Sequence, residues 1–250
     1  MVVGYNPFSL EGKTILVTGA SSGIGRGIAV ACSKMGARVV LVGRSVERLQ
    51  ETLGLMEGAV HETCLCDLND REAVDKLVES LPELNGVVHC AGIGQSVLCR
   101  QLTEKALDKV MDINFKAPVL LQTALLKKKK ILAGASIVFI ASIASWSPCV
   151  GNGAYSASKG AIISYSNCLS LELAPRHIRV NCISPAMVWT DFALKSGLSE
   201  QMLKEDEQKY PLQRYGTPED IAHLAVYMLS DASEWMTGSN VKISGGGKLS

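Results

Sequence analysis

Residues 14–25 read TILVTGASSGIG, and this stretch decides the fold class. Thr14–Thr18 is a short apolar run typical of a buried strand, and three glycines follow at the spacing G-x-x-x-G-x-G. Glycine permits a tight turn and a close backbone approach, and a helix that begins near Gly23 points its amides and its positive dipole end at that turn. The stretch predicts a strand, a phosphate-binding turn and a helix. The alternative is a plain strand-to-helix turn, for which one glycine would suffice.

The alternation of strand and helix patterns continues along the chain. Runs typical of buried strands occur at Thr14–Thr18, Arg38–Val42, His61–Leu65, Gly86–Cys90, Ser136–Ala141, Ile178–Ile183 and Asn240–Ile243. Helical patterns lie between them, at Ile24–Met35, Ser45–Leu55, Asp70–Leu81, Thr103–Lys130, Ala154–Leu173 and Thr217–Leu229. Strands that are apolar on both faces and alternate with helices predict an α/β protein, with a doubly wound parallel sheet of about seven strands and helices on both faces. No linker or repeat divides the pattern, so we expect residues 1–250 to form a single domain.

Composition restricts the function classes. The 250 residues are 47% hydrophobic, and 25 basic against 24 acidic residues give a net charge of +1. We therefore expect neither nucleic-acid nor membrane-surface binding, and no apolar stretch reaches the ~18 residues that span a bilayer. The eight cysteines lie mainly in apolar runs, which is typical of small buried residues in a reducing cytoplasm. No metal site is expected, because Cys64-Leu-Cys66 lacks a second pair of ligands.

Ligands of such sheets bind beyond the carboxyl ends of the strands. The turn after the first strand is predicted to hold the pyrophosphate of a dinucleotide. An NAD site is expected to place an acidic residue at the end of the second strand, but the chain reads Val42-Gly43-Arg44-Ser45 there. Arg44 can pair bidentately with a 2′-phosphate, so NADP(H) is predicted in preference to NAD(H). The alternative is that Arg44 is a solvated loop residue.

A tyrosine and a lysine share one helix face farther along the chain. Tyr155 and Lys159 are four residues apart, so their side chains point the same way. Ser142 follows the fifth predicted strand, and Asn114 interrupts an otherwise apolar helix pattern. The spacing alone is weak evidence, but its position after the fifth strand, beside a glycine-rich turn, indicates a catalytic site.

Taken in order, these motifs resemble the short-chain dehydrogenase/reductase family over nearly the whole chain. The resemblance rests on the turn at 18–25, Asp67, Ala91-Gly92, Asn114, Ser142, Tyr155, Lys159 and Ser184-Pro185. It implies a Rossmann-type fold, a nicotinamide-dependent oxidoreductase acting on CH–OH or C=O groups, and a homotetramer or homodimer. It also implies cofactor contacts at Gly19, Ser21, Ser22, Gly23, Ile24, Gly25, Arg44, Asp67, Leu68, Ala91, Gly92, Tyr155, Lys159, Pro185, Val188 and Thr190.

The family's working set corresponds here to Asn114, Ser142, Tyr155 and Lys159. Tyr155 is expected to act as the proton donor to the reduced carbonyl oxygen, with Ser142 donating to the developing oxyanion. Lys159 is expected to lower the pKa of Tyr155 and to hold the ribose hydroxyls. The resemblance further implies that Asn114 holds a water, that Asp67 contacts the adenine amine and that Thr190 contacts the nicotinamide amide.

The chain departs from the family pattern at two places. His89-Cys90 stands where the family often has two asparagines, and we expect His89 to be a packed strand residue. Ala186 stands where the family has a glycine, so a permissive backbone angle is expected there and the substrate loop is expected to start differently. Neither change removes a catalytic group.

The least patterned stretch, residues 186–210, is expected to form a substrate lid. Apolar side chains of this stretch and of the loop after the fifth strand are predicted to line the substrate pocket together with Ser142; they are Trp146, Cys149, Val150, Met187, Trp189, Phe192, Leu194 and Leu198. Half of them alternatively pack the lid onto the body. Such a pocket favours a ketone, a steroid-like molecule or an acyl chain over a bare sugar.

Two alternatives stay open on function. The run Lys127–Lys130 together with Arg176 is either a solvated helix end or a dock for an acidic acyl carrier protein, as in the family's 3-oxoacyl-carrier-protein reductases. The second alternative is a non-catalytic NADP-binding sensor or scaffold. A degenerate binder is expected to have lost Tyr155 or Lys159, and both are present.

Overall fold

The computed structural model describes residues 5–58, 60–194 and 199–247, and its strands form one parallel sheet. The sheet has seven strands in the order β3-β2-β1-β4-β5-β6-β7. They are β1 (Thr14–Thr18), β2 (Arg38–Gly43), β3 (Glu62–Leu65), β4 (Leu84–His89), β5 (Ile131–Ile140), β6 (Arg179–Pro185) and β7 (Asn240–Ile243). The strand order reverses between β1 and β4, so the predicted doubly wound α/β fold is confirmed and its ligand crevice is expected at the carboxyl ends of these two strands.

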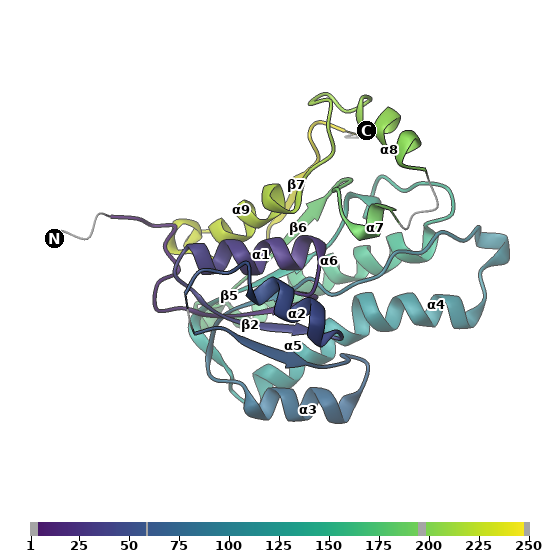
Figure 1. The fold of residues 1–250 in the computed structure, drawn as a ribbon. Coiled ribbons are helices and arrows are strands. Elements are labelled where there is room, and N and C mark those ends of the chain that lie inside the picture. The colour runs from purple at the N-terminus through teal and green to yellow at the C-terminus, as the bar shows by residue number, and fades with distance from the viewer. Residues whose placement is uncertain (1–4, 59, 195–198, 248–250) are drawn as a thin grey trace.

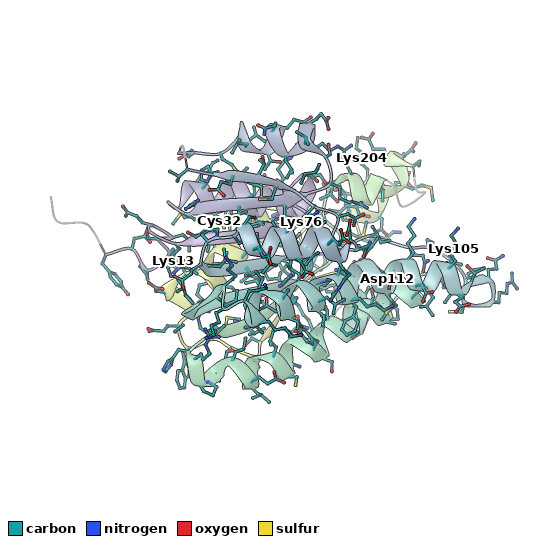
Figure 2. The ribbon with its side chains drawn as sticks, turned by 90° about the horizontal axis from the view of Figure 1, so that it is seen from below. Lys13, Cys32, Lys76, Lys105, Asp112 and Lys204 are labelled. Carbon is teal, nitrogen blue, oxygen red and sulfur yellow. The ribbon has the colours of Figure 1, made fainter. Side chains whose placement is uncertain are left out.

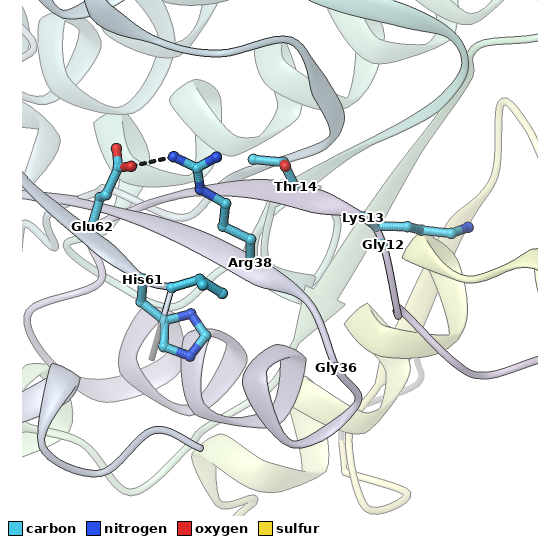
Figure 3. A pocket seen from close by; sticks show the side chains of 8 residues that line it. Gly12, Lys13, Thr14, Gly36, Arg38, His61 and Glu62 are labelled. Atoms are coloured by element: carbon cyan, nitrogen blue, oxygen red, sulfur yellow. Dashed lines mark hydrogen bonds and ion pairs between the residues drawn. The ribbon is translucent and has the colours of Figure 1, made fainter. Parts of the chain in front are cut away.

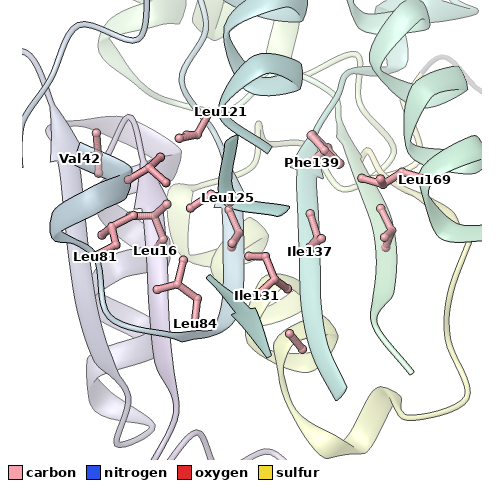
Figure 4. Packing of buried hydrophobic residues seen from close by; sticks show 14 of the residues in the cluster. Leu16, Val42, Leu81, Leu84, Leu121, Leu125, Ile131, Ile137, Phe139 and Leu169 are labelled. Atoms are coloured by element: carbon pink, nitrogen blue, oxygen red, sulfur yellow. The ribbon is translucent and has the colours of Figure 1, made fainter. Parts of the chain in front are cut away.

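Helices cover both faces of the sheet (Figure 1). The α-helices are α1 (Gly23–Lys34), α2 (Val46–Leu53), α3 (Arg71–Ser80), α4 (Glu104–Met111), α5 (Ala117–Lys127), α6 (Gly153–Leu173), α7 (Asp191–Leu194), α8 (Glu200–Glu207) and α9 (Pro218–Leu229). Buried residues of α1, α2 and α9 form the core on one face, and those of α3, α5 and α6 form the core on the other. Figure 4 shows the second core, where Leu121 and Leu125 of α5 pack against Leu16 and Ile137. Burying a leucine side chain stabilises the fold by about 2 kcal/mol.

The ends of several helices follow side-chain caps that the sequence supplies. Ser45 accepts a hydrogen bond from the amide of Arg48 at the start of α2, and Asp70 does the same for two amides of α3. Thr217 and Asp220 form a capping box at α9. Each cap satisfies amides that the helix itself leaves unpaired.

Three segments differ from the sequence prediction. The strand predicted from Ser136 begins at Ile131, and its first half contains Gly134 with positive φ, a residue that interrupts a strand pattern. The helix predicted over residues 103–130 is divided into α4 and α5 by a π-helical segment, η2 (Asp112–Lys116). The unpatterned stretch 186–210 contains two short helices, α7 and α8.

The cysteines differ in burial. All eight are free thiols, but only Cys32, Cys66 and Cys182 are buried, while Cys99, Cys149 and Cys168 are exposed. Cys64 and Cys90 are intermediate, so the prediction that the thiols are mainly buried is wrong for the three exposed ones, because an apolar neighbour in sequence does not place a side chain on the inner face. Within the described ranges, no group of acidic, His or Cys side chains could hold a metal ion, and no helix could cross a membrane.

Candidate active site

The glycine turn after β1 is closed tightly enough to require glycine. Gly19 has φ +67°, and a Cβ there would lie 3.0 Å from the backbone of Ala91 on the neighbouring segment. A Cβ on Gly25 would lie 2.3 Å from the carbonyl oxygen of Gly19. These positions bring the start of α1 directly onto the turn, as a cradle for a phosphate requires.

The first amides of α1 receive no side-chain cap. Ser22 is the N-cap residue in an extended conformation, and its hydroxyl makes no capping hydrogen bond, in contrast to Ser45 and Thr217 at α2 and α9. Arg26 steadies the turn, because its Nη2 donates to the carbonyl oxygen of Ser21 at 2.7 Å. The uncapped amides and the helix dipole suit a pyrophosphate, so the residues present fit a dinucleotide.

Thr18 ties the turn to the end of β4. Its hydroxyl accepts hydrogen bonds from the amides of Cys90 at 3.0 Å and Ala91 at 3.2 Å, and it lies 3.3 Å from the carbonyl oxygen of Val88 as a donor. Sequence reasoning did not assign Thr18 this bracing role. The threonine at the end of a buried strand beside the glycines was the available signal.

The side chains after β2 and β3 are exposed at the same edge. Arg44 is exposed directly after β2. Ser45 is already committed, since it caps α2 and donates to Glu47 at 2.9 Å. Asp67 is exposed and accepts from the amide of Asn69 at 3.0 Å, and Leu68 beside it is partly buried. Arg44 is thus the cation available at the position where a ribose 2′-phosphate is expected.

The sheet and α6 bring Ser142, Tyr155 and Lys159 together. Ser142 follows β5 and caps the short 3-10 helix η3 (Ile143–Ser145), and its side chain hydrogen-bonds with Tyr155. The Nζ of Lys159 lies 5.9 Å from the centroid of the Tyr155 ring and donates to the carbonyl oxygen of Ile140 at 2.8 Å. A phenol, a hydroxyl and an ammonium therefore meet at the carboxyl end of β5.

Burial dominates the ionisation of this group. It raises the pKa of Tyr155 above its usual value, and the hydrogen bond with Ser142 acts in the opposite direction. It lowers the pKa of Lys159 to about 8. The net shift at Tyr155 is upward, because desolvation of the phenol is the larger effect.

Asn114 lies in η2 and is buried. Its Oδ1 accepts from the amide of Ile93 at 2.8 Å, while its Nδ2 donates to the carbonyl oxygen of Ile93 at 2.9 Å and to Ser158 at 3.1 Å. A Cβ on Gly92 would lie 3.2 Å from Asn114 and 3.5 Å from the Nζ of Lys159. The π-helical turn therefore aims the Asn114 amide at the loop after β4, beside Lys159.

Comparisons with known proteins agree with this geometry. A family model described as enoyl-(acyl carrier protein) reductase matches residues 19–248. The 3-oxoacyl-(acyl-carrier-protein) reductase FabG of Rickettsia conorii is 36% identical over 237 residues, which cover 95% of this chain and 97% of that one. The chain belongs to the short-chain dehydrogenase/reductase family. It is accordingly an NAD(P)-dependent oxidoreductase acting on C=O or CH–OH groups, as the resemblance implied.

Other members of the family cover the chain as fully. The human dehydrogenase/reductase SDR family member 4 is 31% identical over 245 residues, covering 95% of this chain and 88% of that one. A dehydrogenase/reductase from Sinorhizobium meliloti has a TM-score of 0.86 at 31% identity, with coverage of 97% and 98%. A Beutenbergia cavernae structure, titled as an NAD(P)-dependent gluconate 5-dehydrogenase with NADP at low occupancy, has a TM-score of 0.86 at 32% identity, with coverage of 98% and 100%.

The segment after β6 reaches back over the glycine turn of this family member. Pro185 and Val188 are buried, and Val188 pairs with Gly216 in a parallel bridge. Thr190 lies against Gly23, where a Cβ would come within 3.1 Å of the Thr190 methyl carbon. Thr190 is therefore placed beside the glycine turn.

Trp189 does not form a free pocket wall. Its Nε1 donates to Glu207 at 2.7 Å, and its ring lies 5.3 Å from that of Tyr215. It packs the segment onto itself, in agreement with the alternative in which half of the apolar residues serve packing and do not line a pocket. The carbonyl oxygen of Met187 is likewise engaged, by the amide of Gly216 at 3.0 Å.

The other predicted substrate residues divide between structural and exposed positions. Trp146 follows η3 and carries Lys242 over its ring at 4.5 Å. Cys149 and Val150 are exposed on the loop before α6. The side chains of Phe192 and Leu194, and the whole of Leu198, lie outside the described residues.

The two departures from the family pattern are accommodated. His89 is buried, stacks on Phe139 with ring centroids 4.6 Å apart, and has its Nε2 3.0 Å from Gln122, so it is a packed strand residue as predicted. Among the described residues, positive φ outside glycine occurs at Lys129, His177 and Gln213. Ala186 therefore needs no permissive backbone angle, and that expectation is wrong.

The lysine run, residues 127–130, lies at the amino ends of the strands, opposite to the carboxyl ends that carry Ser142. It precedes β5, whose carboxyl end carries Ser142, and a strand of that length spans about 30 Å. Lys128 pairs with Glu79, and the Nζ of Lys130 donates to the backbone at the end of α3. Arg176 donates to the carbonyl oxygen of Ile131 at 2.7 Å. These cations make structural contacts far from the candidate active site of the same chain.

A depression of about 630 Å³ also lies at this opposite edge, against the amino ends of β1, β2 and β3 (Figure 3). Its cations are paired, Arg38 with Glu62 and Lys13 with Asp231. Figure 2 shows Lys13 at one end of the molecule and Lys105 and Lys204 toward the other. The depression is therefore separate from the catalytic crevice.

Proposed function

We propose that this protein is an NADP(H)-dependent oxidoreductase that reduces a carbonyl to an alcohol, or runs the reverse reaction, with Tyr155 as general acid and base. The observation that carries the proposal is the hydrogen-bonded pair of Ser142 and Tyr155 beside Lys159. The pair lies at the sheet edge that also presents the uncapped amides of α1. Family membership supports the reaction class.

The cofactor supplies or accepts the hydride when it is bound. We propose that it is held by Gly19, Ser21, Ser22, Gly23, Ile24, Gly25, Arg44, Asp67, Leu68, Ala91, Gly92, Tyr155, Lys159, Pro185, Val188 and Thr190. Arg44 supports the preference for NADP(H), because it is an exposed cation at the end of β2, where an NAD site needs a carboxylate. The related structure from Beutenbergia cavernae carries NADP.

Tyr155 is suited to deliver a proton at neutral pH. Its raised pKa keeps the phenol protonated, so it can donate to the oxygen of a carbonyl under reduction, while Ser142 orients that oxygen. Lys159, with a pKa of about 8, remains mostly cationic at pH 7 and stabilises the phenolate that the donation leaves. Asn114 hydrogen-bonds to Ile93 and to Ser158 of α6, and it thereby positions the helix that carries Tyr155 and Lys159.

Replacing Tyr155 by phenylalanine tests the proposal. Tyr155→Phe keeps the ring and removes the proton, so NADPH should still bind while turnover falls by about 10²-fold or more. Cofactor fluorescence measures the binding, and loss of reduced-cofactor absorbance measures turnover. Near-normal turnover in this variant would place the acid elsewhere.

A 3-oxoacyl-(acyl-carrier-protein) reductase is the second candidate for the substrate. The FabG relatives favour it. The predicted dock at Lys127–Lys130 and Arg176 does not support it within one chain, since those residues lie at the other edge of the sheet. Comparing 3-oxoacyl thioesters with simple ketones and sugars in one absorbance assay separates this candidate from a general carbonyl reductase. If no thioester caused a loss of reduced-cofactor absorbance, this candidate would be rejected.

We also propose a cytoplasmic homotetramer or homodimer, built from single-domain subunits with a lid at about residues 186–210. Exposed apolar side chains on the α4–α6 layer support assembly: Leu107, Leu120 and Leu171. Trp235, on the loop before β7, is fully exposed as well. Sedimentation velocity tests the assembly, and a monomer at micromolar concentration would reject it.

A further inference from the structure

An ion pair joins two walls of the proposed cofactor crevice. Arg48 of α2 and Asp191, the first residue of α7, have Nη1 and Oδ2 3.6 Å apart, and both side chains are about half exposed. Of the ion pairs in the described part of the chain, this one connects the segment after β6 to the β1–α2 region. Arg48 is not among the residues predicted from the sequence to contact the cofactor or the substrate.

Each partner lies near a proposed cofactor contact in the sequence: Asp191 directly follows Thr190, and Arg48 is four residues after Arg44. Arg48 lies in the first turn of α2. Its amide donates to Ser45, which is the N-cap residue and directly follows Arg44. Asp191 follows Thr190, whose methyl carbon lies against Gly23 of the phosphate turn. The pair therefore reaches from the side of the 2′-phosphate site to the segment that lies over the turn.

The segment after β6 is held differently on the two sides of Thr190. Before it, Val188 pairs with Gly216, and the amide of Trp189 donates to the carbonyl oxygen of Gly216 at 2.8 Å. These contacts tie the segment to its own neighbourhood and do not cross the crevice. Asp191 is the first residue after Thr190, and its carboxylate reaches across to α2.

We propose that Arg48 and Asp191 form a clasp over the bound dinucleotide and slow its release. They are positioning residues, because neither is needed for the proton or hydride transfer. The inference rests on the proposed function, since the crevice must hold the cofactor. An exposed ion pair is a weak interaction, so its loss should speed release by roughly twofold to fivefold.

The clasp and a purely electrostatic role predict opposite signs for one variant. Asp191 is an anion beside a site for an anionic ligand. If it acted only through its charge, Asp191→Asn would remove a repulsion and slow the release of NADPH. If it acts as one half of a clasp, the same change opens the crevice and speeds release.

The test measures NADPH release by stopped-flow fluorescence after mixing the preformed complex with an excess of NADP⁺. Arg48→Gln and Asp191→Asn should each release NADPH about twofold to fivefold faster. The charge exchange, Arg48→Asp with Asp191→Arg, should return the rate toward that of the unmodified protein. The single-turnover rate of hydride transfer should not change in any of them. Release from Asp191→Asn at or below the unmodified rate would overturn the clasp.

Arg38→Gln is the matched control. It breaks the pair between Arg38 and Glu62, which has similar exposure and joins β2 to β3 at the amino edge of the sheet, away from the crevice. Its release rate should equal that of the unmodified protein, and an acceleration equal to that of Arg48→Gln would overturn the clasp as a general loss of stability. Failure of the unmodified protein to bind NADPH would instead reject the proposed function.

Discussion

The catalytic cluster and the segment over it are built in opposite ways. Asn114, Ser158 and Lys159 are buried, and each has its polar atoms bound to the backbone or to one another. In the segment from residue 186 to residue 216, Trp189 is partly buried and depends on Glu207 for its hydrogen bond, and Asp191 is exposed. Buried hydrogen bonds fix the geometry of the proposed proton donor, whereas the polar contacts of Trp189 and Asp191 lie nearer to solvent.

The largest effect that this comparison predicts is at Lys159. Lys159→Ala should lower turnover by about 10³-fold, or about 4 kcal/mol, because the cation beside Tyr155 and the donor to the ribose are lost together. The affinity for NADPH should fall as well, unlike in Tyr155→Phe. Steady-state rates and cofactor titration measure the two losses. An unchanged affinity for NADPH would remove the ribose contact from the role of Lys159.

The buried side should also limit stability in acid, through His89. Burial lowers the pKa of His89 from 6.5 to about 4, with the hydrogen bond to Gln122 acting in the opposite direction. Between these two values the unfolded chain binds a proton that the folded chain does not, so stability is retained above pH 6.5 and is lost as the pH falls toward 4. The upper bound on this loss is about 3 kcal/mol.

His89→Asn removes the titrating group and should flatten this part of the stability profile. Urea unfolding at pH 6.5 and at pH 4.5 measures the difference between variant and unmodified protein. His223→Asn, which changes an exposed histidine of α9, is the control and should leave the profile unchanged. A profile for His89→Asn that runs parallel to that of the unmodified protein would contradict the assignment.

Arg44 is expected to have a smaller effect, because it is exposed. Arg44→Ala should reduce the affinity for NADPH about tenfold, or about 1.4 kcal/mol, and leave that for NADH nearly unchanged, because only NADPH carries the 2′-phosphate. Titration of the variant and the unmodified protein with both cofactors measures the preference. Equal affinities in the unmodified protein would contradict the prediction of NADP(H).

The sequence predicted the buried side better than the covering segment, for a physical reason. In a parallel sheet the carboxyl ends of neighbouring strands meet, so Gly19, Asp67 and Ser142 could be placed at one edge from the strand pattern alone. Helical spacing then placed Tyr155 beside Lys159. These deductions need only local periodicity and the topology that follows from it.

What the sequence did not predict depends on contacts between distant residues. Trp189 was predicted in the pocket because its partners, Glu207 and Tyr215, lie in a part of the chain with no periodic pattern. The sign of the pKa shift at Tyr155 depends on how deeply the ring is buried, which a spacing does not reveal. The π-helical turn at Asn114 has no signal beyond a polar residue in an apolar helix.

The smallest expected effect is that of Glu207→Gln, and it tests most directly whether the segment after β6 acts separately from the catalytic cluster. Glu207 accepts from the indole of Trp189 at 2.7 Å and from the amide of Tyr215 at 3.4 Å, so Glu207→Gln weakens two hydrogen bonds by removing the charge of their acceptor. The KM for the carbonyl substrate should rise roughly twofold to threefold, less than about 1 kcal/mol, because the covering segment becomes less ordered.

The rate of hydride transfer at saturating substrate should stay the same in Glu207→Gln, since neither Tyr155 nor Lys159 contacts this segment through a described hydrogen bond. Glu200→Gln is the control on the same helix, because within the described residues that carboxylate pairs with Lys204 of the same helix, and its loss should leave KM unchanged. Single-turnover absorbance measures the transfer step, and steady-state rates give KM. A slower transfer step in Glu207→Gln would mean that the segment helps to position the proton donor, and the division between a fixed catalytic cluster and an adaptable cover would fail.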